Sequence, residues 1–234
     1  MKLEHIRAIG FEVEGGWKKD RVIREDSENY RKGFHSDGSV SNIRASFPVW
    51  AGEYASEPLL NYENLIETME EEWPDMWNSS CGMHVHISTQ SMQKYSTLMD
   101  QVFYRAFKKE ISKVLIPSIT DMNTQQIFAD RLAGHNTYCK TGWRSDAQAQ
   151  QNDKGSLRYH HLNFCWKLHG TMEVRVPPMM SLNDGKTTMK WIVEFTEKYL
   201  NKKKKEKIFK TEIEETPLER QEALLQTTIT KEDY

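Results

Sequence analysis

The chain has 234 residues, of which 38% are hydrophobic and 28% are charged, a balance typical of a globular domain rather than a disordered chain. Lysine and arginine total 32 against 34 acidic residues, so the net charge of −2 argues against a generic nucleic-acid binder while leaving room for a local basic patch. No apolar run reaches the roughly 18 residues of a transmembrane helix, so we expect no membrane span.

The cysteines and the first residues indicate the compartment. Cys81, Cys139 and Cys165 are odd in number and widely spaced, so the sequence predicts neither a disulfide framework nor a CxxC zinc site. The opening stretch MKLEHIRAIGFEVE carries charged side chains and lacks the apolar core of a secretory signal. We therefore expect a cytoplasmic protein with no membrane partner.

In the first part of the chain, hydrophobic periodicity predicts three strands and a helix. Residues 6–14 alternate as a strand, and residues 47–54 form a second strand. Between them, residues 15–46 are polar and contain several glycines, which predicts a long loop or a pair of irregular hairpins. Residues 58–73 carry apolar side chains at helical spacing, and residues 83–88 alternate as a third strand.

The second part begins with one long amphipathic helix, whose apolar face runs from Tyr95 to Ala106 and which ends near Pro117. Residues 118–157 are polar, with a helix expected near residues 125–133 and a loop after it. Two strands, 162–168 and 171–177, flank a tight hairpin, and a last core-facing helix contains residues 189–199.

The end of the chain differs in composition from the rest. We expect one catalytic domain over residues 1–200 and a separate segment over residues 201–234. Residues 202–210 contain six lysines, which we interpret as a solvated helix end or linker, or alternatively as a patch for an acidic substrate or nucleic acid. Residues 216–219, Thr-Pro-Leu-Glu, fit a capping box and predict a short terminal helix.

Three predicted strands each carry two polar side chains at positions i and i+2, which point to the same face of a sheet. Paired carboxylates repel each other unless a cation lies between them, and their oxygen atoms suit Mg²⁺. Paired imidazoles can bind a metal or a phosphate-bearing ligand, and a carboxylate beside a guanidinium can hold a cation and a phosphate side by side. The pairs are Glu12 with Glu14, His84 with His86, and Glu173 with Arg175.

Each pair taken alone also has a structural explanation: a solvent-facing sheet edge, two hydrogen-bonded surface histidines, or an ion pair. A cupin-type metal motif would need a glutamate shortly after the histidines, and residues 89–92 are Thr, Gln, Ser and Met. Three such pairs together favour a functional site, because a sheet face lined in this way is not a hydrophobic core.

Five segments, taken in order, resemble the motifs of a known family, and the resemblance extends from about residue 8 to residue 200. The chain resembles the phage and bacterial amidoligase family of carboxylate–amine ligases, which is related to glutamine synthetase and glutamate–cysteine ligase. The segments are GFEVE (10–14), GEYASEP (52–58), NSSCGMHVHIS (78–88), RYHHLN (158–163) and GTMEVRVPP (170–178).

The resemblance implies an α+β fold like that of glutamine synthetase: a curved antiparallel sheet with the active site on its concave face and helices on the other face. It implies amide-bond formation that depends on ATP and Mg²⁺, with Mn²⁺ as an alternative ion, and that proceeds through an acyl phosphate. The substrates would be a carboxylate and an amine, each on a small molecule, peptide or protein, and a modified nucleotide stays among the candidates. The acid, the amine and the oligomeric state are left open.

The resemblance also assigns roles to individual residues. The metal ligands would be Glu12, Glu14, Glu53, His84 and Glu173. His86 would lie beside the nucleotide phosphates. Arg158 and Arg175 would hold the transferred phosphate or a substrate carboxylate. These two arginines and Glu173 would be catalytic. Asn163 would orient substrate, with Arg131 as a further candidate for substrate binding. Asp37 lies in a turn where its role is either structural or a substrate contact.

Two other functions use the same residues. One is a catalytically silent homologue that acts as a binding or structural protein, and the other is a metal-dependent hydrolase. The chain contains no GxxxxGK[ST] loop, so metal and side chains would have to hold any phosphate. Dependence on ATP would separate the ligase from the hydrolase.

Overall fold

The computed structural model describes residues 3–22, 31–37, 40, 43, 45–144 and 159–214, and for residues 144, 167, 168 and 203–214 only the backbone. Arg158, which was predicted to bind phosphate, lies outside the described residues. Within them, no helix has both the length and the apolar character needed to cross a membrane.

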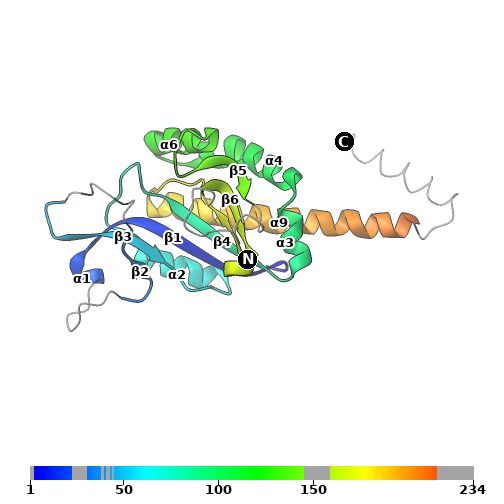
Figure 1. Cartoon of the computed structure of the whole chain (residues 1–234), viewed down its shortest axis with the longest axis horizontal. Helices are drawn as coiled ribbons and strands as arrows, with labels where there is room; N and C mark the ends of the chain where they lie inside the picture. Colours follow the sequence, from blue (N-terminus) through cyan, green and yellow to red (C-terminus); the bar gives the residue numbers. More distant parts are fainter. Residues whose placement is uncertain are drawn as a thin grey trace.

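The described residues form a mixed α+β structure around one seven-stranded sheet, in the order β2-β3-β1-β4-β7-β6-β5 (Figure 1). Neighbouring strands are antiparallel except for β5 and β6, which are parallel. The strands are β1 (Ile6–Lys18), β2 (Phe34–His35), β3 (Val49–Ala55), β4 (Met83–Thr89), β5 (Lys140–Arg144), β6 (His160–Cys165) and β7 (Thr171–Val174).

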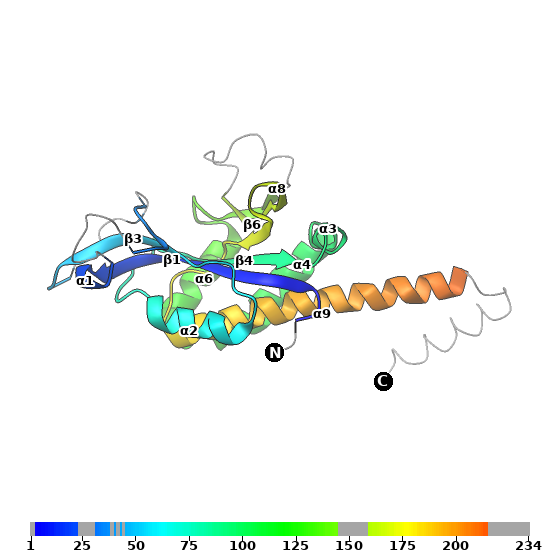
Figure 2. The ribbon, with the colours of Figure 1, turned by 90° about the horizontal axis from the view of Figure 1, so that it is seen from below.

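Most of the helices lie between strands in sequence. Figure 2 shows α2 and α9 on one side of β1 and β4, with α8 on the opposite side. The helices are α1 (Lys19–Val22), α2 (Tyr62–Glu72), α3 (Met92–Leu98), α4 (Gln101–Glu110), the π-helix η1 (Ile111–Leu115), α5 (Ile116–Ser118), α6 (Met122–Ala133), α8 (Trp166–His169) and α9 (Leu182–Glu214).

Strict alternation along the central strands separates a core face from a polar face. On β1, Ile9, Phe11 and Val13 are buried, and their neighbours on β4, such as Val85 and Ile87, are fully buried as well. These side chains belong to the hydrophobic core, which also includes residues of α2 and α9. Because consecutive side chains of a strand point to opposite faces, the residues between them line the other side of the sheet.

The sheet is curved around its polar face. In Figure 2, β6 turns out of the plane of β1, β3 and β4 toward the side opposite α2 and α9. Antiparallel pairing of β4, β7 and β6 continues through this turn. The polar face is therefore partly enclosed, and the predicted α+β class with a largely antiparallel sheet is confirmed.

The first predicted loop begins too early. β1 continues through Gly15 and Gly16 to Lys18, where the sequence predicted a loop from residue 15. The two glycines allow close packing in a strand and do not mark a turn: a Cβ atom on Gly15 would lie 2.5 Å from Cβ of Pro74. Glycine in a strand interior often marks such a close approach.

Two further boundaries differ from prediction. The single long helix predicted after β4 is broken into α3 and α4, because Asp100 leaves the helical conformation and caps α4 by accepting a hydrogen bond from Val102 N at 2.8 Å. β6 and β7 pair as a hairpin, as predicted, but β6 ends at Cys165. One helical turn, α8, then joins the two strands and ends at Gly170, whose φ is +68°.

Helix α9 runs unbroken across residue 200 as far as Glu214, so the backbone of the lysine-rich stretch is helical. Figure 2 shows this helix extending beyond the sheet. The predicted capping box at residues 216–219 lies outside the described residues, and the division of the chain at residue 200 stays a prediction.

Candidate functional site

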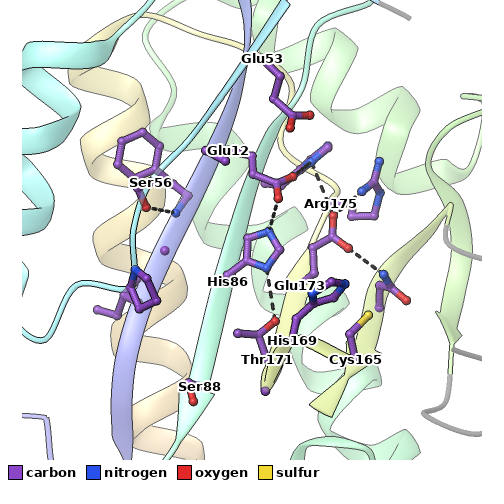
Figure 3. A pocket seen from close by; sticks show the side chains of 18 of the residues that line it. Glu12, Glu53, Ser56, His86, Ser88, Cys165, His169, Thr171, Glu173 and Arg175 are labelled. Atoms are coloured by element: carbon purple, nitrogen blue, oxygen red, sulfur yellow. Dashed lines mark hydrogen bonds and ion pairs between the residues drawn. The ribbon is translucent and has the colours of Figure 1, made fainter. Parts of the chain in front are cut away.

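A cavity of about 610 Å³ lies on the polar face of the sheet (Figure 3). Its walls come from five strands and from a few residues outside the sheet, including Asp37, Arg131 and Tyr138. Among the lining residues are nine with predicted roles: Glu12, Glu14, Glu53, His84, His86, Arg131, Asn163, Glu173 and Arg175. The folded chain therefore brings together every predicted site residue that the structure describes.

Strand register places these side chains beside one another. On β1 and β4, Glu12 is opposite His84, and on β1 and β3, Glu14 is opposite Glu53. Residues that face each other across a strand pair project from the same side of the sheet. The same rule extends the row across β7 and β6, where Glu173 is opposite both His86 and Asn163.

A first group of candidate ligands contains Glu12, His86 and Glu173, whose ligand atoms lie within 4.8 Å of one another. His86 Nε2 is 3.1 Å from one oxygen of Glu12. His84 Nδ1 is 3.1 Å from the other oxygen of Glu12 and 3.5 Å from Glu173 Oε1. Both histidines thus contact the central carboxylate.

The charges of this group depend on each other. Burial alone would raise the pKa of Glu12, but the charge of His86 and the hydrogen bond with His84 outweigh it and hold this pKa well below its usual range. Burial would likewise lower the pKa of His86, but the charge of Glu12 raises it to about 9. In the absence of another cation, protonated His86 neutralises Glu12 at neutral pH.

Glu173 is held from two sides. Arg175 Nη1 donates a hydrogen bond to one of its carboxylate oxygens, and Asn163 Nδ2 donates to the other at 2.7 Å. Burial would raise the pKa of Glu173, but Arg175 and His84 lower it, so the carboxylate is ionised. The Arg175 guanidinium also lies over the ring of Tyr159, 5.7 Å from its centroid, which fixes its plane.

A second group consists of Glu14, Asp37 and Glu53, again with ligand atoms within 4.8 Å of one another. Burial and the charges of Glu12, Glu14 and Asp37 raise the pKa of Glu53 to about 8. Three carboxylates this close repel one another, and a bound cation would relieve the repulsion. Gly82 N donates a hydrogen bond to Glu14 Oε2 at 2.6 Å, which fixes the orientation of that side chain.

Several buried polar atoms in the cavity have no hydrogen-bond partner among the described residues: His86 Nε2, Arg131 Nε, Asn163 Oδ1 and Arg175 Nε. The contact of His86 Nε2 with Glu12 is an ion pair by distance but is not aligned as a hydrogen bond. Buried polar groups are usually hydrogen-bonded, so such a concentration of unpaired donors and acceptors is typical of a ligand site.

Arg131 lines the cavity but is engaged elsewhere. Its two terminal nitrogens donate to backbone carbonyl groups before β4 and after β7. Burial lowers the pKa of this arginine. These contacts are to the backbone, and the role of Arg131 in substrate binding stays a prediction.

The grouping of the ligands could be read only in part from the sequence. The resemblance assigned His84 to a metal and His86 to phosphate, whereas the compact group in the structure contains His86. Asp37 joins the second group, although its turn left its role undecided. The only signal for Asp37 was an acidic residue in a glycine-containing turn, which is too common to single out a ligand.

The cavity continues away from the carboxylates, along β1 and β4, toward Ser56, Ser88 and Trp166. Gly10 forms part of its floor. A Cβ atom there would have ordinary contacts, 3.5 Å from Ser56 Oγ and 3.6 Å from His86 Cβ. A larger side chain on Gly10 would therefore project into this arm of the cavity.

Comparison of the chain with known proteins found no relative. No family model matches the chain, and neither a curated protein nor a solved structure shows significant similarity to it. The functional assignment therefore depends on the chemistry of the cavity.

Proposed function

We propose that this chain is an ATP- and Mg²⁺-dependent carboxylate–amine ligase of the amidoligase type, with a glutamine-synthetase-like sheet. The observation that carries the proposal is the presence of two candidate cation-binding groups in one cavity. One consists of Glu12, His86 and Glu173, and the other of Glu14, Asp37 and Glu53. Two such groups suit a reaction in which a polyphosphate is held and a phosphoryl group is transferred.

The residues present fit divalent ions. Carboxylate oxygens dominate both groups, with one imidazole in the first, and this donor set suits Mg²⁺ and Mn²⁺. Burial and, after it, the charges of neighbouring carboxylates raise the pKa of Glu53, and a bound cation would reduce this electrostatic cost. Glu12, His86 and Glu173 would hold one ion, and Glu14, Asp37 and Glu53 the other.

Bound ATP with its Mg²⁺ ions would supply the phosphoryl group that activates a carboxylate toward an amine. Arg175 lines the cavity, and its guanidinium is suited to bind an anionic oxygen and to stabilise charge that develops there. Asn163 lines the cavity beside Glu173, and its side-chain amide would orient the amine. The partly enclosed cavity would limit access of water to the activated group.

The arm of the cavity beyond His86 is the proposed place of the nucleoside. It is lined by neutral polar and small residues such as Gly10, Ser56 and Thr171 and by the aromatic side chain of Trp166. These groups offer hydrogen bonds and a flat apolar surface without the acidic charge that would repel a nucleotide. The phosphates would then extend toward the two acidic groups.

Calorimetry with ATP tests this proposal directly. We expect ATP to bind with Mg²⁺ or Mn²⁺ present and only weakly after chelation, and we expect Glu12→Gln to abolish the difference. Equal affinity with and without the divalent ion would contradict the metal assignment.

Phosphate release, measured while acids and amines are screened in pairs, then separates the possible functions. ATP-dependent release that requires both partners supports a ligase, and hydrolysis of a substrate without ATP supports a hydrolase. ATP binding without any turnover supports a silent homologue.

A further inference from the structure

The turn that precedes β4 is held by one buried side chain. Arg131, on α6, is only 5% exposed. Its Nη2 donates to the carbonyl oxygens of Ser80 at 3.1 Å and Cys81 at 2.8 Å and lies 3.4 Å from that of Ser79. Its Nη1 donates to Pro177 O at 3.2 Å. The guanidinium therefore contacts three consecutive carbonyl groups of the turn and links the turn to the segment after β7.

The residue that follows this turn fixes a carboxylate of the second acidic group. Gly82 N donates to Glu14 Oε2 at 2.6 Å, and Gly82 O accepts from Glu14 N at 3.0 Å. Glu14 is thus held through both its backbone and its side chain. A carboxylate that accepts a backbone hydrogen bond of this kind has a defined orientation, so the oxygen lone pairs that are left to bind a cation also have a defined orientation.

Space around Gly82 is tight for a side chain. A Cβ atom there would lie 3.1 Å from Arg131 Nη1, 3.1 Å from His84 Nε2 and 3.4 Å from Glu14 Oε2. Glycine at this position lets the arginine, the histidine and the carboxylate approach the same point of the backbone. An added methyl group would require Arg131 or His84 to shift by a few tenths of an ångström.

The backbone end of Arg131 is fixed as well. Its carbonyl accepts from His161 Nε2 at 2.9 Å, so the proton of this neutral imidazole is on Nε2. His161 Nδ1 then accepts from the hydroxyl of Tyr104 at 3.0 Å, and the same hydroxyl accepts from Gly142 N at 2.7 Å. A chain of buried hydrogen bonds therefore ties the end of α6 to α4, β5 and β6.

From these contacts we infer that Arg131 is a positioning residue for the Glu14–Asp37–Glu53 group and not a substrate ligand. It orders the turn so that Gly82 presents its N–H to Glu14, and Glu14 in turn faces Asp37 and Glu53. This role rests on the proposed cation binding at that group. Residues that orient a metal ligand typically change metal affinity by about 10- to 100-fold when they are replaced.

The charge of Arg131 offers a competing explanation, since a cation near Glu14 could act by electrostatics alone. Lysine keeps the charge but not the planar fork that reaches several carbonyl groups at once. Arg131→Lys therefore separates the two explanations. If geometry is what matters, lysine does not restore ion binding at the second group.

The experiment is a titration with Mn²⁺, followed by calorimetry and by electron paramagnetic resonance. The wild-type chain should bind two ions. Arg131→Lys should weaken one ion by about tenfold or more and leave the other within about twofold. Arg105→Lys, at an exposed arginine of α4, is the matched control and should bind both ions as the wild type does.

A double-mutant cycle identifies which ion is affected. Glu14→Gln alone should weaken the ion of the second group, and adding Arg131→Lys to it should cause little further loss, because both changes act through the same carboxylate. Gly82→Ala should also weaken the ion of the second group through the contact with Glu14, and because its Cβ would press on His84 as well, a smaller loss is expected at the first group. Its loss at the second group decides the question if Arg131→Lys does not fold. Thermal melting of each variant establishes that the fold is retained.

Each outcome bears on one claim or on both. If the wild type binds two ions and neither Arg131→Lys nor Gly82→Ala changes either affinity, the positioning role is wrong while the proposed function stands. Equal weakening of both ions by Arg131→Lys would also overturn it, since the effect of that change would then be general. A wild-type chain that binds no Mn²⁺ overturns both the proposed function and this inference.

Discussion

The two faces of the central sheet use the same strands for different purposes. On one face of β1, Phe11 and Val13 are buried in the hydrophobic core, and on the other, Glu12 and Glu14 line the cavity. Apolar burial on the core face stabilises the fold, whereas grouping carboxylates on the cavity face opposes it. Adjacent residues of one strand should therefore respond to substitution in different ways, in stability on one side and in ligand binding on the other.

The largest expected effect tests the core face. Phe11→Ala removes a ring that is 1% exposed and should lower the free energy of unfolding by about 3–5 kcal/mol. Chemical denaturation without divalent ions measures this value. Glu53→Gln, on the cavity face, is the control: burial and neighbouring carboxylates disfavour the charge of Glu53, so this change should alter stability by far less. Similar losses for both variants would remove the distinction between the faces.

A second prediction concerns His161, which is two residues before Asn163 on β6 but does not line the cavity. His161 is fully buried, and burial lowers its pKa from 6.5 to about 4. Between these values the unfolded chain binds a proton that the folded chain does not, so His161 makes stability fall as pH falls from about 6.5 to 4. The full contribution is on the order of 3 kcal/mol.

Comparison of His161→Gln with the wild type isolates this contribution from those of other groups. The difference in unfolding free energy between the two proteins should change across the pH range 4 to 6.5 and be constant above it. A difference that is constant throughout would show that His161 has an ordinary pKa in the folded chain.

The third prediction addresses catalysis on the cavity face. Arg175→Lys keeps a positive charge but loses the planar fork that contacts Glu173 and faces the cavity. We expect kcat to fall by about 100-fold, equivalent to about 2.7 kcal/mol, with a smaller change in KM for ATP. Steady-state kinetics measures both values. A variant with only a raised KM would mean that Arg175 binds the ground state alone.

The smallest expected effect concerns the arm proposed for the nucleoside. Gly10→Val should weaken ATP binding by about tenfold, or about 1.4 kcal/mol, because its methyl groups would project into this arm. Mn²⁺ affinity should not change, since the carboxylates stay in place. Gly10→Ala adds only a Cβ with ordinary contacts and should have a weaker effect. Unchanged ATP affinity for both variants would place the nucleoside elsewhere.

Elements with a clear local pattern were predicted well. Alternation identified β4, and helical spacing identified α2, because each pattern results from the geometry of a single segment. The errors occurred where a local signal had more than one meaning. Glycines at residues 15 and 16 suggested a loop but serve close packing, and the break at Asp100 lies within an apolar pattern that continues across it.

The candidate site shows the same division. Each i, i+2 pair is local, so the sequence could predict that Glu12 and Glu14 share a face and that His84 and His86 do too. The sequence could not predict that Asp37 would join Glu14 and Glu53, since Asp37 comes from outside the strands. Nor could it predict that Arg131 would be occupied by backbone carbonyl groups, because those contacts span about fifty residues.

The sequence by itself determined which side chains share a face on each strand, since the direction of a side chain alternates along any extended chain. Only the tertiary structure decided which strands are neighbours and in what register, and hence that Glu53 lies beside Glu14 and that Glu173 lies beside His86. Register depends on backbone hydrogen bonds between distant segments and on how the core face packs against α2 and α9. The two candidate cation-binding groups therefore form only when the strands pack in this way.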